Sequence, residues 1–198
     1  MPRPARKQEE NTTYHIWTRC IEWRALMKKD HFKHLLVETI IQTQEFYSFE
    51  LVAYQVMDNH LHLVVRTVPG GAPISRIMQY LKARFAEKYN RKTGRIGPFW
   101  NERYRDSVVE DAVLPDIYLL WLLWYLAFNP VRKGLVGDPR KSPFGSILSY
   151  LDENHRDPVK ITHHKFFLAL GATFAERLKK FLYFEDAYRR RLSVIWAW

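Results

Sequence analysis

Two neighbouring segments with alternating apolar residues constrain the fold of this chain most strongly. Residues 49–57 (FELVAYQVM) and 60–67 (HLHLVVRT) each alternate with a period of two and are rich in β-forming side chains. Only Asp58 and Asn59 separate them, and an Asp-Asn pair between two such runs is typical of a tight turn. The sequence therefore predicts a β-hairpin over residues 49–67.

The segments on either side of this hairpin predict the rest of the sheet. Residues 14–20 (YHIWTRC) are typical of a first strand, and residues 105–110 are expected to form a fourth. Apolar residues at helical spacing predict helices that begin near Asp30 and Pro73. The order strand, helix, strand, strand, helix, strand predicts an α+β fold, a ferredoxin-like sandwich whose antiparallel sheet carries two helices on one face.

The longest apolar run, residues 117–128 (IYLLWLLWYLAF), is too short for the roughly 20 residues that a membrane span needs. It predicts a buried helix that begins at Pro115 and ends before Pro130, because proline disfavours the helical conformation of the residue before it. The N-terminus lacks the apolar segment of a signal peptide, and a single cysteine, Cys20, excludes an intrachain disulfide. We therefore expect a cytoplasmic protein that does not enter a membrane.

The chain is long enough for one substantial domain, which we expect over residues 1–150, followed by a helical C-terminal extension over residues 151–198. Gly171 is typical of a helix break within this extension. The adjacent His163 and His164 are expected at its surface. The extension ends in a basic and aromatic stretch that we expect to dock on the domain or bind DNA: Arg189, Arg190, Arg191, Trp196 and Trp198.

The net charge of +10 is concentrated in residues 76–105, where nine basic side chains stand against only Glu87 and Glu102. The basic residues are Arg76, Lys82, Arg84, Lys88, Arg91, Lys92, Arg95, Arg103 and Arg105. Aromatic residues are interleaved with them, a mixture that favours nucleic-acid binding because it neutralises phosphates and stacks on bases. The alternative is an ordinary solvated helix face followed by a basic loop.

Two histidines separated by one residue, His60 and His62, point to the same side of the predicted third strand. They can offer two imidazole nitrogens to one metal ion, although a pair of half-buried, hydrogen-bonded histidines is the alternative. The residues between and after them, Leu61, Leu63 and Val65, would then face the two helices. Asp58 has the parity of a third ligand, but we favour its role in the turn.

Tyr125 and Asn129 stand four residues apart at the end of the apolar helix, so they share one helix face. A phenol can act as a covalent nucleophile on a phosphate, and an amide oxygen is a hard metal ligand. A helix packed on the open face of the sheet would bring Tyr125 over the two histidines, whereas the alternative is an ordinary core tyrosine. The rival nucleophiles Tyr104 and Tyr118 have no amide side chain four residues later, and His15 is a candidate base.

Three motifs, taken in order, resemble the HUH single-strand transposases, in particular the REP-associated tyrosine transposases and their insertion-sequence relatives. They are VMDNHLHLVVRT (residues 56–67), GPFWNERYRDSVVED (97–111) and DIYLLWLLWYLAFNPVRKGLV (116–136). The similarity runs from about residue 10 to 150. One departure is Asp58, where the family usually has proline.

The resemblance implies that His60, His62 and Asn129 bind Mg²⁺ or Mn²⁺ and that Tyr125 attacks DNA. Because histidine pairs by themselves suit zinc, copper or nickel better, this choice of metal rests on the resemblance. The implied function of a catalytic domain at 1–150 is metal-dependent nicking and strand transfer on single-stranded or hairpin DNA through a 5′-phosphotyrosine. The expected DNA-binding side chains are Arg66, Arg76, Lys82, Arg84, Lys88, Arg91, Lys92, Arg95, Trp100, Arg103, Tyr104, Arg105 and Arg132. A non-catalytic nucleic-acid-binding module of the same fold and a phosphodiesterase that uses water are the alternatives.

Overall fold

A four-stranded antiparallel sheet forms the middle layer of the protein. The computed structural model describes residues 9–195. Its strands are β1 (Thr13–Arg19), β2 (Phe49–Val56), β3 (His60–Thr67) and β4 (Arg105–Val108), in the order β2-β3-β1-β4. Each crossover skips one strand, so every neighbouring pair is antiparallel and the predicted ferredoxin-like sandwich is confirmed.

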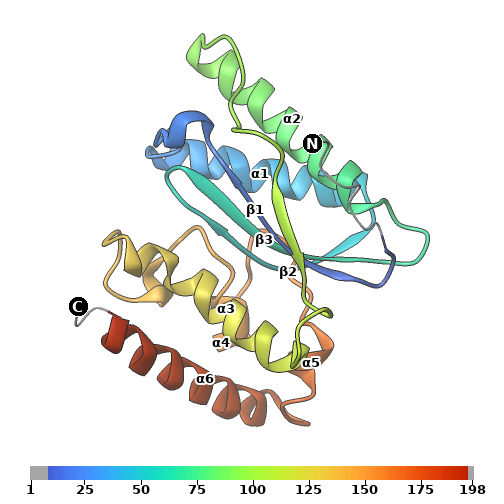
Figure 1. Ribbon diagram of the computed structural model, residues 1–198, viewed down its shortest axis with the longest axis vertical. Helices are drawn as coiled ribbons and strands as arrows, with labels where there is room; N and C mark the ends of the chain where they lie inside the picture. The colour runs from blue at the N-terminus through green and yellow to red at the C-terminus, as the bar shows by residue number, and fades with distance from the viewer. Residues whose placement is uncertain (1–8, 196–198) are drawn as a thin grey trace.

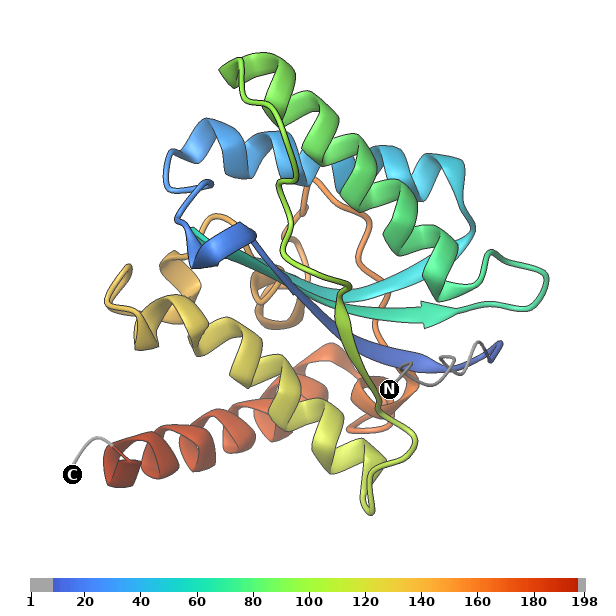
Figure 2. The same ribbon diagram turned by 45° about the horizontal axis from the view of Figure 1, so that its top comes forward.

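Two helices, α1 (Asp30–Phe46) and α2 (Ile74–Thr93), cover one face of this sheet (Figure 2). Alternate residues of β3 point towards them, because side chains on a strand alternate between the two faces. The resulting core is apolar and includes Leu61, Leu63 and Val65 of β3 together with residues of both helices. The predicted orientation of β3 is therefore confirmed.

The opposite face carries α3 (Pro115–Arg132), which is backed by α6 (Phe174–Ile195) on its outer side (Figures 1 and 2). The short helices α4 (Leu148–Leu151) and α5 (Lys165–Leu168) complete this layer. Two 3₁₀ turns also occur, η1 (Ile21–Trp23) and η2 (Pro139–Lys141). Among the described residues, no helix combines the length and the apolarity that a membrane crossing requires.

Helix α3 continues two residues beyond Pro130, so the prediction that it ends before this proline is wrong. A proline inside a helix removes one backbone donor and costs about 3 kcal/mol. Here Pro130 lies in the last turn and is buried, and the side-chain amide of Asn129 donates to the carbonyl of Tyr125 at 2.8 Å. Packing of the apolar helix on both sides offsets the lost hydrogen bond.

The C-terminal extension is part of a second core rather than a separate unit. Phe181 of α6 stacks on Trp124 of α3 with ring centroids 4.7 Å apart, and the Trp124 indole donates to the carbonyl of Phe181 at 3.1 Å. The predicted break at Gly171 is confirmed, since it lies between α5 and α6. Trp196 and Trp198 lie outside the described residues.

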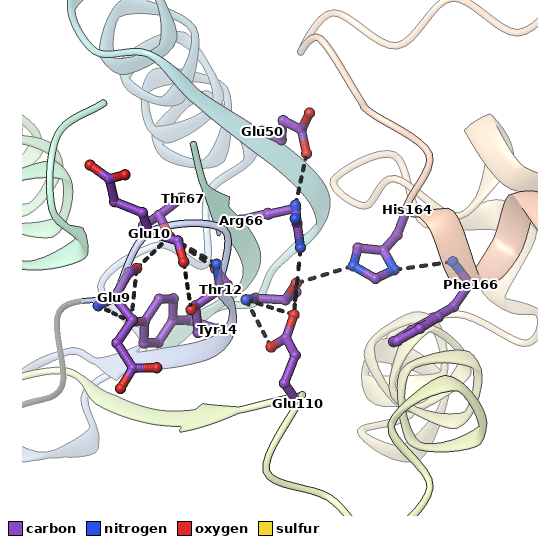
Figure 3. Close-up of polar contacts among 11 residues, drawn as sticks. Glu9, Glu10, Thr12, Tyr14, Glu50, Arg66, Thr67, Glu110, His164 and Phe166 are labelled. Atoms are coloured by element: carbon purple, nitrogen blue, oxygen red, sulfur yellow. Dashed lines mark hydrogen bonds and ion pairs between the residues drawn. The ribbon is translucent and has the colours of Figure 1, made fainter. Parts of the chain in front are cut away.

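A buried polar network ties the extension to the sheet (Figure 3). The side chain of His164 is only 3% exposed, so its predicted surface position is wrong. Its Nδ1 accepts from the backbone N–H of Phe166 at 3.3 Å, which leaves Nε2–H to donate to Thr13 Oγ1 at 3.1 Å. Thr13 in turn donates to Glu110 at 2.8 Å. Burial lowers the pKa of His164 to about 4, so the imidazole is neutral at physiological pH.

Candidate active site

A cleft of about 1300 Å³ opens between α3 and the strand ends of the histidine face. The antiparallel register of β1 and β3 pairs Trp17 with His62 and Arg19 with His60, so all four side chains share this face. The side chains that line the cleft include His15, Trp17, Arg19, His60, His62, Arg105, Ser107, Tyr118, Trp121, Tyr125, Asn129, Arg132, Lys133, Tyr188 and Arg191. The cleft is therefore lined by imidazoles, aromatic rings and basic groups together.

The two β3 histidines are held by hydrogen bonds on one edge of each ring. His62 Nδ1 lies 3.1 Å from His15 Nε2, and His60 Nδ1 lies 2.6 Å from the side-chain oxygen of Asn59. In both rings, the nitrogen left for another partner is Nε2. Such contacts fix the orientation of a metal-binding histidine.

Burial keeps these imidazoles in the neutral form that binds metal ions. Desolvation lowers the pKa of His15 to about 4 and holds that of His62 well below its usual value. The pKa of His60 is also lowered to about 4, first by burial and then by the positive charges of Arg19 and Lys133.

Tyr125 of α3 lines the cleft instead of pointing into the apolar interior. Its ring centroid lies 5.6 Å from that of His62 and 6.2 Å from that of His15, both in edge-on contact. The guanidinium of Arg132, two turns further along α3, lies 5.7 Å from the tyrosine ring. The predicted meeting of this phenol with the histidine pair is therefore present in the structure.

Asn129 is one turn after Tyr125 and lines the same cleft. Because its amide nitrogen donates to the Tyr125 carbonyl, the side-chain oxygen is the atom that can bind a cation. Within residues 9–195 no three His, Cys, Asp or Glu side chains form a metal-binding group. A divalent ion would thus need the two histidine nitrogens, the Asn129 oxygen and oxygens of solvent or substrate. Nitrogen and oxygen atoms of these kinds are ordinary ligands of divalent metal ions.

Asp58 is not part of this donor set. Its carboxylate lies 2.9 Å from Lys33 Nζ of α1, on the side of the turn away from the cleft. The turn role that the sequence favoured for Asp58 is confirmed by its position between β2 and β3.

The predicted DNA-binding residues fall into two groups. Arg105 and Arg132 line the cleft, as do Arg19 and Lys133, which sequence reasoning missed, and Arg191 of the extension, which was expected to dock on the domain or bind DNA. Arg19 could have been found from its parity, since it alternates with His15 and Trp17 along β1. Lys133 follows the last residue of α3, where the alternation of a strand gives no guidance.

The remaining predicted residues are not among those that line the cleft: Arg66, Arg76, Lys82, Arg84, Lys88, Arg91, Lys92, Arg95, Trp100, Arg103 and Tyr104. Those at 76–92 belong to α2, on the far side of the sheet (Figure 1). Trp100 and Tyr104 are buried in the first core, so neither ring offers a face to a base in this structure. The sequence predicted α2 on the face opposite the histidines, so charge and aromatic content alone were the reason for expecting these residues to bind DNA.

Arg66 shares the face of the histidines but lies at the opposite end of β3. Its guanidinium lies 3.5 Å from Glu50 and 3.6 Å from Glu110, within the network that includes His164 (Figure 3). We expected Arg66 to bind DNA, yet the six residue steps from His60 to Arg66 place it roughly 20 Å from the histidine end of the strand. Parity places a side chain on a face and says nothing about its distance along the strand.

Comparisons with known proteins agree with this architecture. The sequence profile of a family described as "Transposase IS200 like" matches residues 8–117, more than half of the chain. A Haemophilus influenzae protein named as a REP-associated tyrosine transposase is 28% identical over 125 residues. That alignment covers 59% of this chain and 65% of the relative, so the chain spans less than two thirds of the relative's length.

A solved structure described as a REP-associated tyrosine transposase bound to a REP hairpin has a similar fold. The TM-score is 0.62 at 17% sequence identity, and the match covers 83% of this chain and 95% of the other. At this identity the likeness shows a shared fold. The four-stranded antiparallel sheet with its flanking helices is thus an arrangement that both proteins adopt.

Proposed function

This chain belongs to the IS200-like transposase family, and we propose that it nicks and rejoins single-stranded DNA at hairpin-containing sites through a covalent bond to Tyr125. The observation that carries the proposal is the convergence of Tyr125 with His60, His62 and Asn129 in one cleft. These residues come from a strand and a helix that are about sixty residues apart in the sequence. Packing alone does not require a phenol, two imidazoles and an amide at one solvent-accessible point.

In the proposed step, the phenol oxygen of Tyr125 forms a bond to phosphorus while the bond from phosphorus to the 3′ oxygen breaks. The phenol loses its proton and the departing 3′ oxygen gains one, so the products are a 5′-phosphotyrosine and a free 3′-OH. Attack by another 3′-OH reverses the step and joins two strands. Covalent capture conserves the phosphodiester energy, so no cofactor has to supply it.

His60, His62 and Asn129 are the residues that would hold Mg²⁺ or Mn²⁺. When bound, such an ion would polarise the scissile phosphate and neutralise charge that develops on its oxygens. The protein's own contribution is to keep the imidazoles of His60 and His62 neutral through burial, and oriented through contacts with Asn59 and His15. The family resemblance, rather than the donor set, favours magnesium or manganese.

The basic groups of the cleft support a single strand as substrate. Arg105 lines the cleft from β4 and Arg132 lines it from α3. Arg19 of β1, the register partner of His60, lies at the histidine end. Each can neutralise one phosphate of a strand that passes Tyr125. The solved structure with the same fold holds a REP hairpin, which supports hairpin-containing DNA as the substrate class.

The test mixes the full-length protein, Mn²⁺ and a pool of end-labelled hairpin oligonucleotides, and then looks for an adduct that survives denaturing electrophoresis. We expect an adduct with the native chain and none with Tyr125→Phe. The matched control is Tyr118→Phe, since Tyr118 lines the same cleft from the same helix and should leave the adduct intact.

Two outcomes would contradict the proposal. One is an adduct that persists in Tyr125→Phe, which would assign the chemistry to another residue. The other is tight binding of hairpin DNA without an adduct for any oligonucleotide, which would make the protein a binding module of this fold.

A further inference from the structure

The chain leaves β1 through an unusual turn at the histidine end of the cleft. In η1, Glu22 has a φ of 53° and Trp23 a φ of 59°, both in the left-handed region. Residues with a Cβ rarely adopt this conformation, and two in succession are kept only where the surrounding structure imposes them. The turn is therefore a candidate for a functional element.

The neighbouring segments hold this turn at both ends. The backbone N–H of Cys20 donates to the carbonyl of Asn59 at 2.8 Å, and that of Ile21 donates to Phe99 at 2.9 Å. The side-chain amide of Asn59 donates to the carbonyl of Trp23 at 3.3 Å. Asn59 also contacts the ring of His60, so the turn is connected directly to a histidine of the site.

The result of this geometry is an exposed indole on the wall of the cleft. Trp23 is 59% exposed, whereas Trp100 and Trp124 are buried in the two cores. The guanidinium of Arg19 lies 3.7 Å from the centroid of the Trp23 ring and covers part of it. Because Arg19 is the register partner of His60, this stacked pair lies next to the histidine end of the site.

An exposed indole beside cationic groups fits an unpaired nucleobase better than an apolar protein surface. A base presents a π face whatever its identity, and its phosphates match the charges of Arg19 and Lys133, which line the same cleft. A purely apolar partner would have to desolvate both charges.

We infer that Trp23 is a stacking platform for one unpaired base beside the phosphate that Tyr125 attacks, with Arg19 holding both the indole and the strand. This inference rests on the proposed function and adds the residue that positions the single strand at the histidine end. Trp23 is a positioning residue, since it does not contact the reacting atoms.

The test measures binding in a Tyr125→Phe background without divalent ions, so that no strand is cut. Hairpin oligonucleotides carry 2-aminopurine at one unpaired position at a time, and stacking is read as quenching of its fluorescence. We expect quenching at one position. Trp23→Asn should abolish that quenching and weaken binding about 5-fold to 150-fold, which corresponds to about 1 to 3 kcal/mol.

The variants are chosen to separate stacking from folding. Asparagine tolerates the left-handed backbone, so Trp23→Asn removes the ring and keeps the turn. Trp23→Tyr should restore most of the quenching, because it returns an aromatic ring. Tyr183→Ala removes a ring that is 67% exposed on α6 and outside the cleft, and it should change neither signal.

Unchanged affinity and unchanged quenching at every position in Trp23→Asn would overturn the inference while leaving the proposed function intact. Failure of the Tyr125→Phe parent to bind any hairpin or single strand would overturn both. The two failures are thus distinguished by the parent protein alone.

Discussion

The two faces of the sheet bury different kinds of side chain, although the same strands supply both. Towards α1 and α2, the residues Ile16, Leu61, Leu63 and Val65 form a continuous apolar core. Towards α3, the same two strands present Thr13, His15, His60, His62 and Arg66, with Val64 as the apolar exception on β3. On β1 and β3, one face thus contributes to the first core, and the other carries groups that can bind and react.

This difference shows that β1 and β3 place their core residues and their candidate site residues on opposite faces. Burying a polar group is unfavourable unless it is hydrogen-bonded. The α3 face meets this condition through linked contacts, His15 with His62 and His164 with Thr13. Because successive residues of a strand point to opposite faces, substitutions at two adjacent positions should differ in effect. One should reduce activity, and the other should reduce the free energy of unfolding.

The sharpest test of this separation compares two adjacent residues of β3. His62→Ala should reduce the rate of adduct formation by about 10³-fold, since it removes a predicted ligand of a metal ion whose charge stabilisation is worth several kcal/mol. Leu63→Ala should lower the free energy of unfolding by about 2 to 5 kcal/mol, since it opens a cavity in the first core. Denaturant titrations and adduct yields measure the two effects. Equal losses of activity in both variants, at a temperature where both remain folded, would remove the distinction between the faces.

The contact between His15 and His62 predicts a smaller effect on metal binding. His15→Phe removes the nitrogen that holds the His62 ring, and loss of such a partner typically weakens metal affinity 10-fold to 100-fold. Calorimetric titration of the folded protein with Mn²⁺ measures this without DNA. His31→Phe, an exposed position on α1, is the control. The account is contradicted if both variants bind Mn²⁺ as the native chain does.

The buried histidines also predict how stability depends on pH. The pKa of His164 is about 4 in the folded protein and returns to its usual value near 6.5 on unfolding. Between these values the unfolded chain binds more protons, so stability is lost as the pH falls from about 6.5 towards 4. The pKa values of His15 and His60 are lowered to about 4 and act in the same direction.

The contribution of His164 alone can be isolated with His164→Asn. Denaturant titrations should show that the free energy of unfolding falls between pH 7 and pH 4.5, and that this fall is smaller in the variant by about 2 kcal/mol. Identical pH dependence in both proteins would mean that His164 is not held neutral by burial.

The smallest predicted effect concerns arginines on opposite sides of the sheet. Arg132→Ala, in the cleft, should weaken single-strand binding and lower the salt dependence of log K by about 0.7. Arg84→Ala, on α2 and paired with Glu87, should leave the salt dependence unchanged. Fluorescence anisotropy titrations measure this dependence. A lower salt dependence for Arg84→Ala together with an unchanged one for Arg132→Ala would place the bound strand on the α2 side.

Much of the fold followed from the sequence because alternation and helical spacing are local signals. They predicted the hairpin, the strand order and the division of β3 between two faces. The helix end at Pro130 was mispredicted, since the packing that sustains α3 comes from α6, far along the chain. The burial of His164 was missed for the same reason, because its partner Thr13 is 151 residues away.

The site was predictable where local pattern coincided with spatial position. Spacing placed Tyr125 and Asn129 on one helix face, and parity placed His60 beside His62. Distances along or across the sheet were not predictable. Arg66 was therefore included among the DNA-binding residues, and the contact of His15 with His62 was not foreseen. The charge-rich helix α2 was expected to bind DNA because net charge does not specify a face.

The most direct measurement of the central claim is the identity of the residue that becomes attached to DNA. After reaction with a hairpin oligonucleotide and Mn²⁺, nuclease and trypsin treatment should leave a nucleotide on the peptide of residues 106–132, which contains both Tyr118 and Tyr125. Fragmentation by tandem mass spectrometry assigns the modified tyrosine. We predict a 5′-phosphate on Tyr125, and a nucleotide on Tyr118 or on any other residue would contradict the account.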